Sequence, residues 1–318
     1  MCRGGEIQLV KSKMALEQRG HEVILFDQWK HNLSEADVVH QFSVQGGIYN
    51  FCNYVHHNRI PLVISPILWL ADRLDQYPMG EIGYMTQVAD VICPNSEAEV
   101  VRFRRYLDIP AEKFLVTHNG VDGCFFDPVT PGVFLSAYPI QYPFVLCVGN
   151  IEERKNQLAL LEANAAIGVH TVLIGNVRDT GYFASMRERF GGGFTYLGYM
   201  EHDSLLLRSA YSACVAFALP SLLETPGLAA LEAAAVGAPL VITKEGCTEE
   251  YFGSDALYVD PKNVEDISNK ILLAMRNKNY GGDLKNRVRC FSWDKVAEEL
   301  EGAYTRAIST SKLKMNSN

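Results

Sequence analysis

Short apolar runs rich in valine, isoleucine and leucine recur along the chain and alternate with longer segments of helical periodicity. In the first half the runs predict strands at 21–29, 36–42, 61–68, the end of 84–96 and 113–122. The helices predicted there lie at 6–20, 46–60 and 97–109, and the segment 84–96 is predicted to begin as a helix and to end as a strand. Ser96 is the expected N-cap of the helix at 97–109. In the second half, strands are predicted at 144–150, 170–176, 194–200, 214–220, 239–244 and 256–260, and helices from Asn156 and at 264–275 and 293–308. This alternation predicts an α/β protein with doubly wound parallel sheets, whose strands are buried on both faces.

The 318 residues suffice for two domains that each bury a core. With a Pro- and Tyr-rich stretch as the linker, we expect a Rossmann-like domain at 1–138 and a second at 139–290. A C-terminal helix at 291–310 and a disordered tail at 311–318 complete the predicted organisation. Ligands of such sheets bind beyond the carboxyl ends of the strands, so the cleft between the domains is the expected site. The first domain lacks the opening strand usual before its glycine loop: either that strand lies upstream of Met1, or the sheet is one strand short.

The segment 220–243, PSLLETPGLAALEAAAVGAPLVIT, reads as a strand end, a loop, a helix and the next strand. Pro226 suits the first helical position, where its missing N–H costs nothing. Gly237 is expected to end the helix. Two carboxylates interrupt this apolar segment: Glu224 lies just outside the helix start and Glu232 inside it, with seven residues between them.

A helix without a polar face is expected to be buried, so an ionised Glu232 needs hydrogen-bond partners, which a ribose diol would supply. The free N–H groups and positive dipole end near Gly227 and Leu228 suit a diphosphate. From Pro226 to Glu232 the helix rises ~9 Å, about the distance from phosphate to ribose. Glu224 then lies on the far side of the phosphate, beside a sugar. The spacing is equally compatible with Glu224 complementing the helix dipole and Glu232 pairing with a neighbouring lysine.

Further polar residues follow predicted strands. Arg154 and Lys155 lie on a strand-to-helix loop at the expected ligand edge, where two cations suit a diphosphate. Taken alone, a solvated basic pair is the more common explanation. His118 and Asn119 end a strand of the first domain and could face the cleft, as could His40, although a lone histidine is more often structural than catalytic.

Two weaker signals lie in the second half. Tyr199 and Met200 follow a strand and could present backbone groups to a nucleotide base. The triple glycine at 191–193 is interpreted as a surface turn and not a phosphate loop, because no helix follows it.

Composition limits the classes of function. The formal net charge of -8 argues against nonspecific binding of nucleic acid. The eight cysteines are scattered without a CxxC pair or metal-like spacing, and we interpret them as reduced thiols of a cytoplasmic protein. No apolar run is long enough to span a membrane, and the start MCRGGEIQ is not typical of a signal peptide.

Together these stretches resemble glycosyltransferase family 4, the retaining nucleotide-sugar transferases with two Rossmann-like domains (the GT-B fold). The matching motifs occur in order over nearly the whole chain: GGEIQLV, ADVICPNSEAE, VTHNGVD, VGNIEERKN, LGYM, PSLLETPGLAALEAAAVGAPLVIT and FSW. The resemblance implies an acceptor-side first domain, a donor-binding second domain, and a final helix that crosses back near Trp293.

The resemblance also implies residue roles. Glu224 matches the position that contacts the donor sugar near the reacting carbon, and Glu232 the position that holds the ribose. Lys155 matches the diphosphate-binding lysine, and Gly4 and Gly5 the glycine loop of the first domain. The predicted catalytic residues are Glu224, Lys155 and Arg154, the donor-binding residues are Glu232, Gly227, Leu228, Gly5, Gly4, Asn150 and Met200, and the acceptor-side candidates are His118 and Asn119.

The implied reaction transfers a sugar from a nucleoside diphosphate sugar to the hydroxyl of a glycan or lipid-linked acceptor, with retention of anomeric configuration and without a metal or other cofactor. The implied setting is synthesis of cell-surface glycan or polysaccharide, which allows peripheral contact with the inner membrane face. Residues 100–107 come closest to a basic amphipathic helix suited to that contact.

Three departures from the family pattern keep alternatives open. The opening strand is absent, Asn150 stands where many relatives carry a second phosphate-binding arginine, and Pro66 stands where many have an active-site histidine. A noncatalytic or truncated member that binds a nucleotide sugar would tolerate these departures. A nucleotide-sugar epimerase or a hydrolase could also use the same architecture, because fold alone does not decide the reaction.

Overall fold

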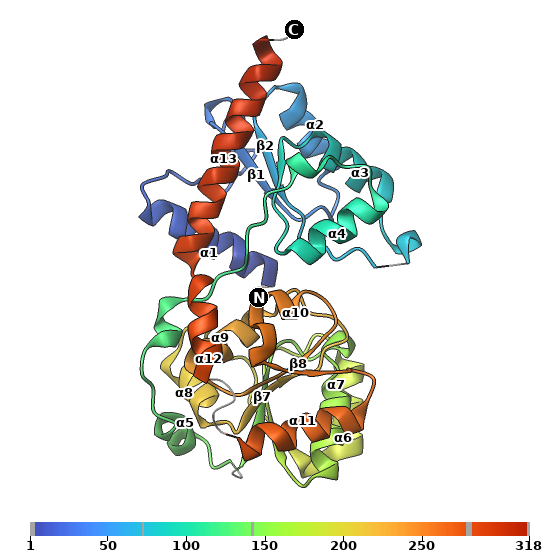
Figure 1. Ribbon diagram of the computed structural model, residues 1–318, viewed down its shortest axis with the longest axis vertical. Helices are drawn as coiled ribbons and strands as arrows, with labels where there is room; N and C mark the ends of the chain where they lie inside the picture. Colours follow the sequence, from blue (N-terminus) through green and yellow to red (C-terminus); the bar gives the residue numbers. More distant parts are fainter. Residues whose placement is uncertain (1–3, 72, 141–142, 278–281, 317–318) are drawn as a thin grey trace. The chain divides into compact units, whose positions relative to one another are not determined.

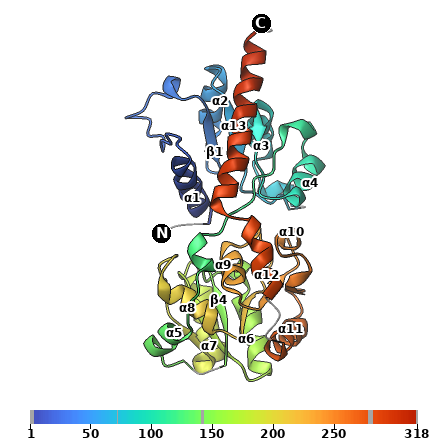
Figure 2. The ribbon, with the colours of Figure 1, turned by 60° about the vertical axis from the view of Figure 1, so that its left-hand side comes forward.

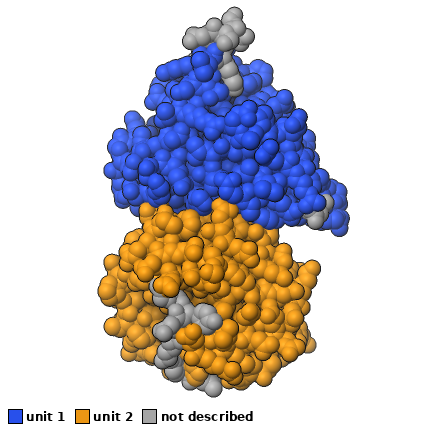
Figure 3. All heavy atoms as spheres, in the orientation of Figure 1, with its two compact units in different colours: residues 1–120, 293–318 blue, residues 121–292 orange. Residues whose placement is uncertain are grey.

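The computed structural model describes residues 4–71, 73–140, 143–277 and 282–316. The chain divides into two compact units: residues 1–120 with 293–318 form unit 1, and residues 121–292 form unit 2 (Figure 3).

Unit 1 combines a small parallel sheet with helices (Figure 1). Its strands are β1 (Val39–Phe42), β2 (Leu62–Ser65) and β3 (Val91–Ile92), paired in the order β1-β2-β3. Its α-helices are α1 (Gly4–Gln18), α2 (Tyr49–His57), α3 (Met79–Val88), α4 (Glu97–Tyr106) and α13 (Trp293–Asn316). Short 3-10 helices are η1 (Leu33–Glu35), η2 (Leu74–Gln76) and η3 (Ala111–Lys113).

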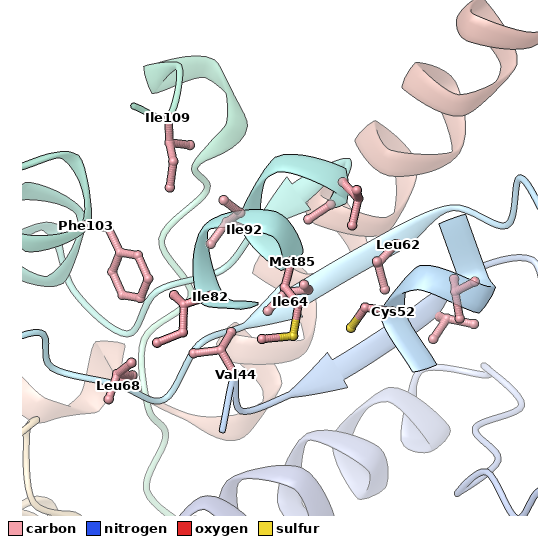
Figure 4. Close-up of a cluster of buried hydrophobic side chains, with 14 of the residues drawn as sticks. Val44, Cys52, Leu62, Ile64, Leu68, Ile82, Met85, Ile92, Phe103 and Ile109 are labelled. Atoms are coloured by element: carbon pink, nitrogen blue, oxygen red, sulfur yellow. The ribbon is translucent and has the colours of Figure 1, made fainter. Parts of the chain in front are cut away.

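The two faces of this sheet bury alternate residues of β2, as the two-residue period of a strand requires. Leu62 and Ile64 point into the apolar cluster formed with α2, α3 and α4, shown in Figure 4. Val63 points the other way and packs against Ala303 and Ala307 of α13. Figures 1 and 2 show α13 running alongside α1 in this unit. Helices therefore cover both faces, which confirms the predicted doubly wound arrangement.

Unit 2 has a six-stranded parallel sheet in the order β6-β5-β4-β7-β8-β9. The strands are β4 (Phe144–Val148), β5 (His170–Ile174), β6 (Phe194–Tyr196), β7 (Ala216–Leu219), β8 (Leu240–Thr243) and β9 (Leu257–Val259). The α-helices are α5 (Gly132–Ala137), α6 (Gln157–Ala166), α7 (Thr180–Phe190), α8 (Leu205–Ala213), α9 (Leu228–Val236), α10 (Thr248–Phe252), α11 (Val264–Arg276) and α12 (Gly282–Arg287). The 3-10 helices are η4 (Gly123–Phe126), η5 (Glu153–Lys155), η6 (Gly191–Gly193), η7 (Gly253–Asp255) and η8 (Val288–Cys290).

Two predicted strands of unit 1 are wrong. Residues 21–29 form no strand, and Ile24, Phe26 and Trp29 are exposed there. Among the described residues this segment pairs with none of the strands β1, β2 and β3. Residues 113–122 make only isolated bridges, such as Ile92 with Phe114.

The boundary between the units differs from the expected one. Residues 121–138 belong to unit 2 because η4 packs on α9 and α5 packs on α8. The backbone N–H of Phe134 in α5 donates to Ser209 Oγ of α8 at 2.9 Å. The C-terminal helix joins unit 1 from Trp293 onward.

The prediction of a disordered tail at 311–318 is also wrong for the residues that the structure describes, since α13 continues to Asn316. The Ser311 side chain is buried, and its hydroxyl donates to the carbonyl of Arg59 at 3.4 Å. In the described part of the chain, no helix is long and apolar enough to cross a membrane.

Candidate functional site

An ion pair lies where β4 and β7 of unit 2 end. The Lys155 ammonium donates to Oε1 of Glu224 at 2.6 Å, although 69 residues separate them in sequence. Lys155 ends η5 after β4, and Glu224 lies between β7 and α9, so the parallel sheet brings them to one edge. Both side chains are largely buried, with 12% and 4% of their areas exposed. The two residues predicted from separate motifs are thus neighbours.

The backbone of Glu224 is fixed by the loop after β8. Its N–H donates to the carbonyl of Glu245 at 3.1 Å, and its carbonyl accepts from the N–H of Cys247 at 3.1 Å. Gly246 between them has φ +115°, and a Cβ there would lie 1.9 Å from the Glu224 carbonyl oxygen. Only glycine allows this close approach. No motif in the sequence singled out Gly246.

The Glu224 carboxylate lies against the start of α9. The helix begins at Leu228 with Gly227 as its N-cap at φ +90°, and a Cβ on Gly227 would lie 3.0 Å from Glu224 Oε2. The positive end of the helix dipole therefore lies beside this carboxylate. The predicted helix is confirmed, but Pro226 precedes the cap instead of occupying the first helical position. Gly237 ends the helix in the left-handed conformation, as predicted.

Arg154 lies at the same edge and is about half exposed. It donates to the Leu223 carbonyl at 3.1 Å and to Glu152 at 3.1 Å, and approaches Glu224 Oε1 to 3.9 Å. Its backbone carbonyl accepts from Leu222 N–H at 2.9 Å. The loops that carry Arg154 and Glu224 are therefore joined by main-chain and side-chain hydrogen bonds.

Asn156 joins a further loop to this edge, a role that the sequence did not reveal. Asn156 adopts the left-handed backbone conformation with φ +56°, which asparagine tolerates better than most residues. Its amide donates to the carbonyls of Pro220 at 2.9 Å and Pro261 at 2.8 Å. The loops after β4, β7 and β9 are thereby tied together.

Glu232, the second carboxylate, lies inside α9 with 5% of its area exposed. Tyr211 of α8 donates its hydroxyl to Oε2 at 2.7 Å, and His202 Nδ1 lies 3.2 Å from Oε1. Burial, with Glu232 beside it, raises the pKa of Tyr211 well above its ordinary value, so the hydroxyl stays a donor. His202 Nε2 lies 2.9 Å from Asp122 Oδ2. Sequence reasoning missed Tyr211 and His202 as partners of Glu232, and Asp122 as a partner of His202.

These carboxylates and the histidine form a hydrogen-bonded chain. Within the described ranges, no group of three or more His, Cys, Asp or Glu side chains is placed to hold a metal ion. The contacts of His202 with Asp122 and with Glu232 are within hydrogen-bond distance, at 2.9 and 3.2 Å.

The remaining donor-side candidates of unit 2 also follow strands. Asn150 comes after β4, and its carbonyl accepts from the side chain of Gln157 at 2.8 Å. Gln157 is fully buried at the start of α6, so it fixes the loop that leads to Lys155. Met200 is buried in the segment between β6 and α8, and exposed Tyr199 precedes it.

Unit 1 holds the other candidates. Gly4 and Gly5 are the first residues of α1, and a Cβ on Gly5 would touch Ile67 at 3.4 Å. The His118 N–H donates to Glu299 of α13 at 2.9 Å, and Asn119 beside it is buried.

His40 in β1 is structural in this unit. Its ring nitrogens lie 2.8 Å from Tyr304 Oη and 2.9 Å from Ser65 Oγ, so it links the sheet to α13. Burial lowers the pKa of His40 to about 3, which leaves it neutral near pH 7.

Comparison with known proteins matches part of this chain to a protein family. Residues 137–290 match the family described as glycosyl transferases group 1. O-antigen chain mannosyltransferase B of Escherichia coli is 26% identical over 66% of this chain and 58% of its own length. Serotype-specific mannosyltransferase WbdA of Escherichia coli is 26% identical over 81% of this chain and 34% of its own length. The chain therefore spans less than two thirds of either relative.

Solved structures share the fold at low identity. Sucrose-phosphate synthase from Thermosynechococcus elongatus aligns with a TM-score of 0.74 at 19% identity, covering 97% of this chain and 81% of that one. Anabaena HepE, solved in complex with UDP, aligns with a TM-score of 0.73 at 18% identity, covering 86% and 79% of the two chains.

Proposed function

Because residues 137–290 match the glycosyl transferases group 1 family and the chain has the GT-B fold, we propose that this protein transfers a sugar from a nucleoside diphosphate sugar to an acceptor hydroxyl with retention of configuration. The observation that carries the proposal is the buried pair of Lys155 and Glu224 at the start of α9. It places a cation, a helix N-terminus and a carboxylate at one edge of the sheet. These are the groups that a diphosphate and an adjoining sugar require.

In this proposal the donor lies along the start of α9. Lys155, Arg154 and the backbone of Gly227 and Leu228 bind the diphosphate, and Glu232 accepts hydrogen bonds from the ribose hydroxyls. The order of these groups supports the assignment, since Glu232 lies one helical turn beyond Leu228. Asn150, which follows β4, and Met200, in the segment after β6, complete the donor site.

The proposed chemistry is a front-face displacement. The bond between the anomeric carbon and the diphosphate oxygen breaks, the acceptor oxygen bonds to that carbon on the same face, and the acceptor proton passes to the departing diphosphate. Glu224 positions the sugar, while Lys155, Arg154 and the helix start stabilise the charge that develops on the leaving group. A retaining hydrolase would instead require a carboxylate nucleophile about 5 Å from a second catalytic carboxylate.

These cations and backbone dipoles can stabilise a diphosphate without a divalent ion, so we propose a metal-independent reaction. Turnover should then persist in EDTA. Complete loss in EDTA with recovery on added Mg²⁺ contradicts this part of the proposal.

We further propose that the acceptor is a growing glycan or a lipid-linked glycan in cell-surface polysaccharide synthesis. Support comes from the two Escherichia coli relatives, whose names describe O-antigen and serotype-specific mannosyltransferases. Within unit 1, His118 and Asn119 are the acceptor-side candidates.

Thermal denaturation across a panel of UDP-, GDP- and ADP-sugars tests the donor site, because a ligand of the folded state raises the midpoint. We expect one donor to raise the midpoint of the wild type and to lose this effect in Glu232→Ala. A folded wild type that responds to no donor contradicts the proposal.

A further inference from the structure

His202 lies between two carboxylates of unit 2. Its Nδ1 is 3.2 Å from Glu232 Oε1, and its Nε2 is 2.9 Å from Asp122 Oδ2. The histidine stands in the segment before α8, Asp122 directly precedes η4, and Glu232 belongs to α9. About a fifth of the His202 and Asp122 side-chain areas is exposed, so the contacts are partly shielded from water.

The geometry determines what charge the imidazole must carry. A neutral imidazole donates from one ring nitrogen and presents a lone pair at the other. Placed between two carboxylates, that lone pair would face a carboxylate oxygen and repel it. An imidazolium donates from both nitrogens, so it satisfies both contacts and compensates part of the negative charge.

The surroundings restrict how this ring can move. The Phe125 ring meets it edge-on, with centroids 5.7 Å apart, and Phe125 is fully buried. Tyr211 holds the other oxygen of Glu232 at 2.7 Å. The two oxygens of this carboxylate are thus fixed by separate elements, so its plane cannot rotate without losing a hydrogen bond.

We propose that His202 is a positioning residue of the donor site: as an imidazolium held by Asp122, it fixes the carboxylate of Glu232 in the orientation that receives the ribose hydroxyls of a nucleoside diphosphate. This inference rests on the proposed function. His202 touches neither the sugar nor the diphosphate in this arrangement, so it acts through Glu232 on binding and not on the chemical step.

The charge makes donor binding depend on pH. The other charged or titratable groups on the elements around His202 are Glu201, Asp203, Arg208, Tyr211, Asp127, Lys285 and Arg289. Arg208 donates to the Cys124 carbonyl at 2.8 Å and lies 3.8 Å from Asp127, so its charge is engaged beside η4. Asp122 and Glu232 are carboxylates in direct contact with the two ring nitrogens. Deprotonation of His202 at high pH therefore loosens Glu232 and weakens nucleotide binding.

The protonation state can be measured without a ligand. A long-range proton–nitrogen NMR spectrum of the full chain, with the signal assigned by its loss in His202→Gln, reports both ring nitrogens. At about pH 7.5 an ordinary imidazole with a pKa of ~6.5 is mostly neutral. We expect His202 to show the doubly protonated pattern at this pH and to lose it in Asp122→Asn. A neutral tautomer in the wild type at this pH overturns the proposal.

The effect on binding is measured by calorimetry with UDP and GDP as probes. We expect His202→Ala and His202→Gln to bind the preferred nucleotide about fivefold more weakly, the value of about one hydrogen bond. His170→Ala is the matched control. This histidine is also partly buried, and its Nε2 lies 2.8 Å from Thr195 Oγ1. His170 begins β5, so it lies at the amino ends of the strands, whereas the proposed donor site lies at their carboxyl ends.

The outcomes separate the two proposals. The affinity of the wild type for the nucleotide should decline as pH rises from about 6 to about 9. This range covers the titration of an ordinary imidazole and of one whose charged form is stabilised by carboxylates. The affinity of His202→Gln should stay constant over the same range. Equal affinity in the wild type and both folded variants overturns the positioning role and leaves the proposed function standing. A wild type that binds neither nucleotide overturns the donor site and the positioning role together.

Discussion

The ammonium of Lys155 and the carboxylate of Glu224 form a 2.6 Å ion pair at the start of α9. Each side chain is largely buried, so each depends on the other to offset the cost of leaving water. The pair therefore contributes to the stability of unit 2 as well as to the proposed donor site.

Removing either partner should destabilise the fold. We expect Lys155→Met and Glu224→Gln each to lower the free energy of unfolding by about 1–3 kcal/mol, because a buried charge is left uncompensated. The double variant should lose less than the sum of the single losses, as measured by urea denaturation. Arg189→Met is the control, since Arg189 and Glu162 form an exposed pair whose loss should cost under ~1 kcal/mol. Strict additivity of the two single losses would show that the buried pair is not coupled.

The two glutamates should differ in kinetics. Glu232→Ala should weaken donor binding about a hundredfold with a smaller change in kcat, because two hydrogen bonds from ribose to a carboxylate are lost. Glu224→Ala should mainly lower kcat, since its proposed partner is the sugar at the reacting carbon. Steady-state kinetics with the donor identified by thermal denaturation measures both. Unchanged kinetics in both variants would end the assignment of the donor site.

Gly246 should tolerate no side chain. We expect Gly246→Ala to lower the free energy of unfolding by at least about 1 kcal/mol and to reduce kcat, because its Cβ would meet the Glu224 carbonyl at 1.9 Å. Gly192→Ala is the matched control, since a Cβ there has no atom within 4 Å. Comparable stability and turnover in both variants would mean that the loop after β8 adjusts without moving Glu224.

The free energy of unfolding should depend on the protonation of His40 at acidic pH. Its folded pKa of about 3 lies below the ordinary value of ~6.5, so the unfolded chain binds the extra proton between these values. The free energy of unfolding should therefore fall as pH drops from about 6.5 toward 3, by at most ~1.4 kcal/mol per pH unit from this group. His40→Gln should remove this part of the slope, measured as the difference between wild-type and variant denaturation curves. Parallel curves for the two proteins would show that folding leaves the pKa of His40 unchanged.

Several features were predictable because their causes are local in sequence. Strands buried on both faces must be apolar at successive positions, so β4, β7 and β8 were visible as apolar runs. The end of α9 followed from Gly237, and the cap of α4 from Ser96, whose side chain accepts from the Glu99 N–H. The same local reasoning placed Lys155 and Glu224 after buried strands, and a parallel sheet brings such positions to one edge.

Periodicity and chain order were enough to predict the doubly wound architecture, the carboxylate-bearing α9 and the edge at which Lys155 and Glu224 meet. The distant residues that hold these groups in place became visible only in the folded chain. Asp122 and His202 lie 80 residues apart, and Gly246 acts on Glu224 through a contact between two loops. The apolar run at 21–29 matched a strand pattern and yet forms no strand among the described residues, so apolar pattern alone did not specify pairing there. Local pattern specifies elements, whereas the partners of buried polar groups depend on how the packed elements meet.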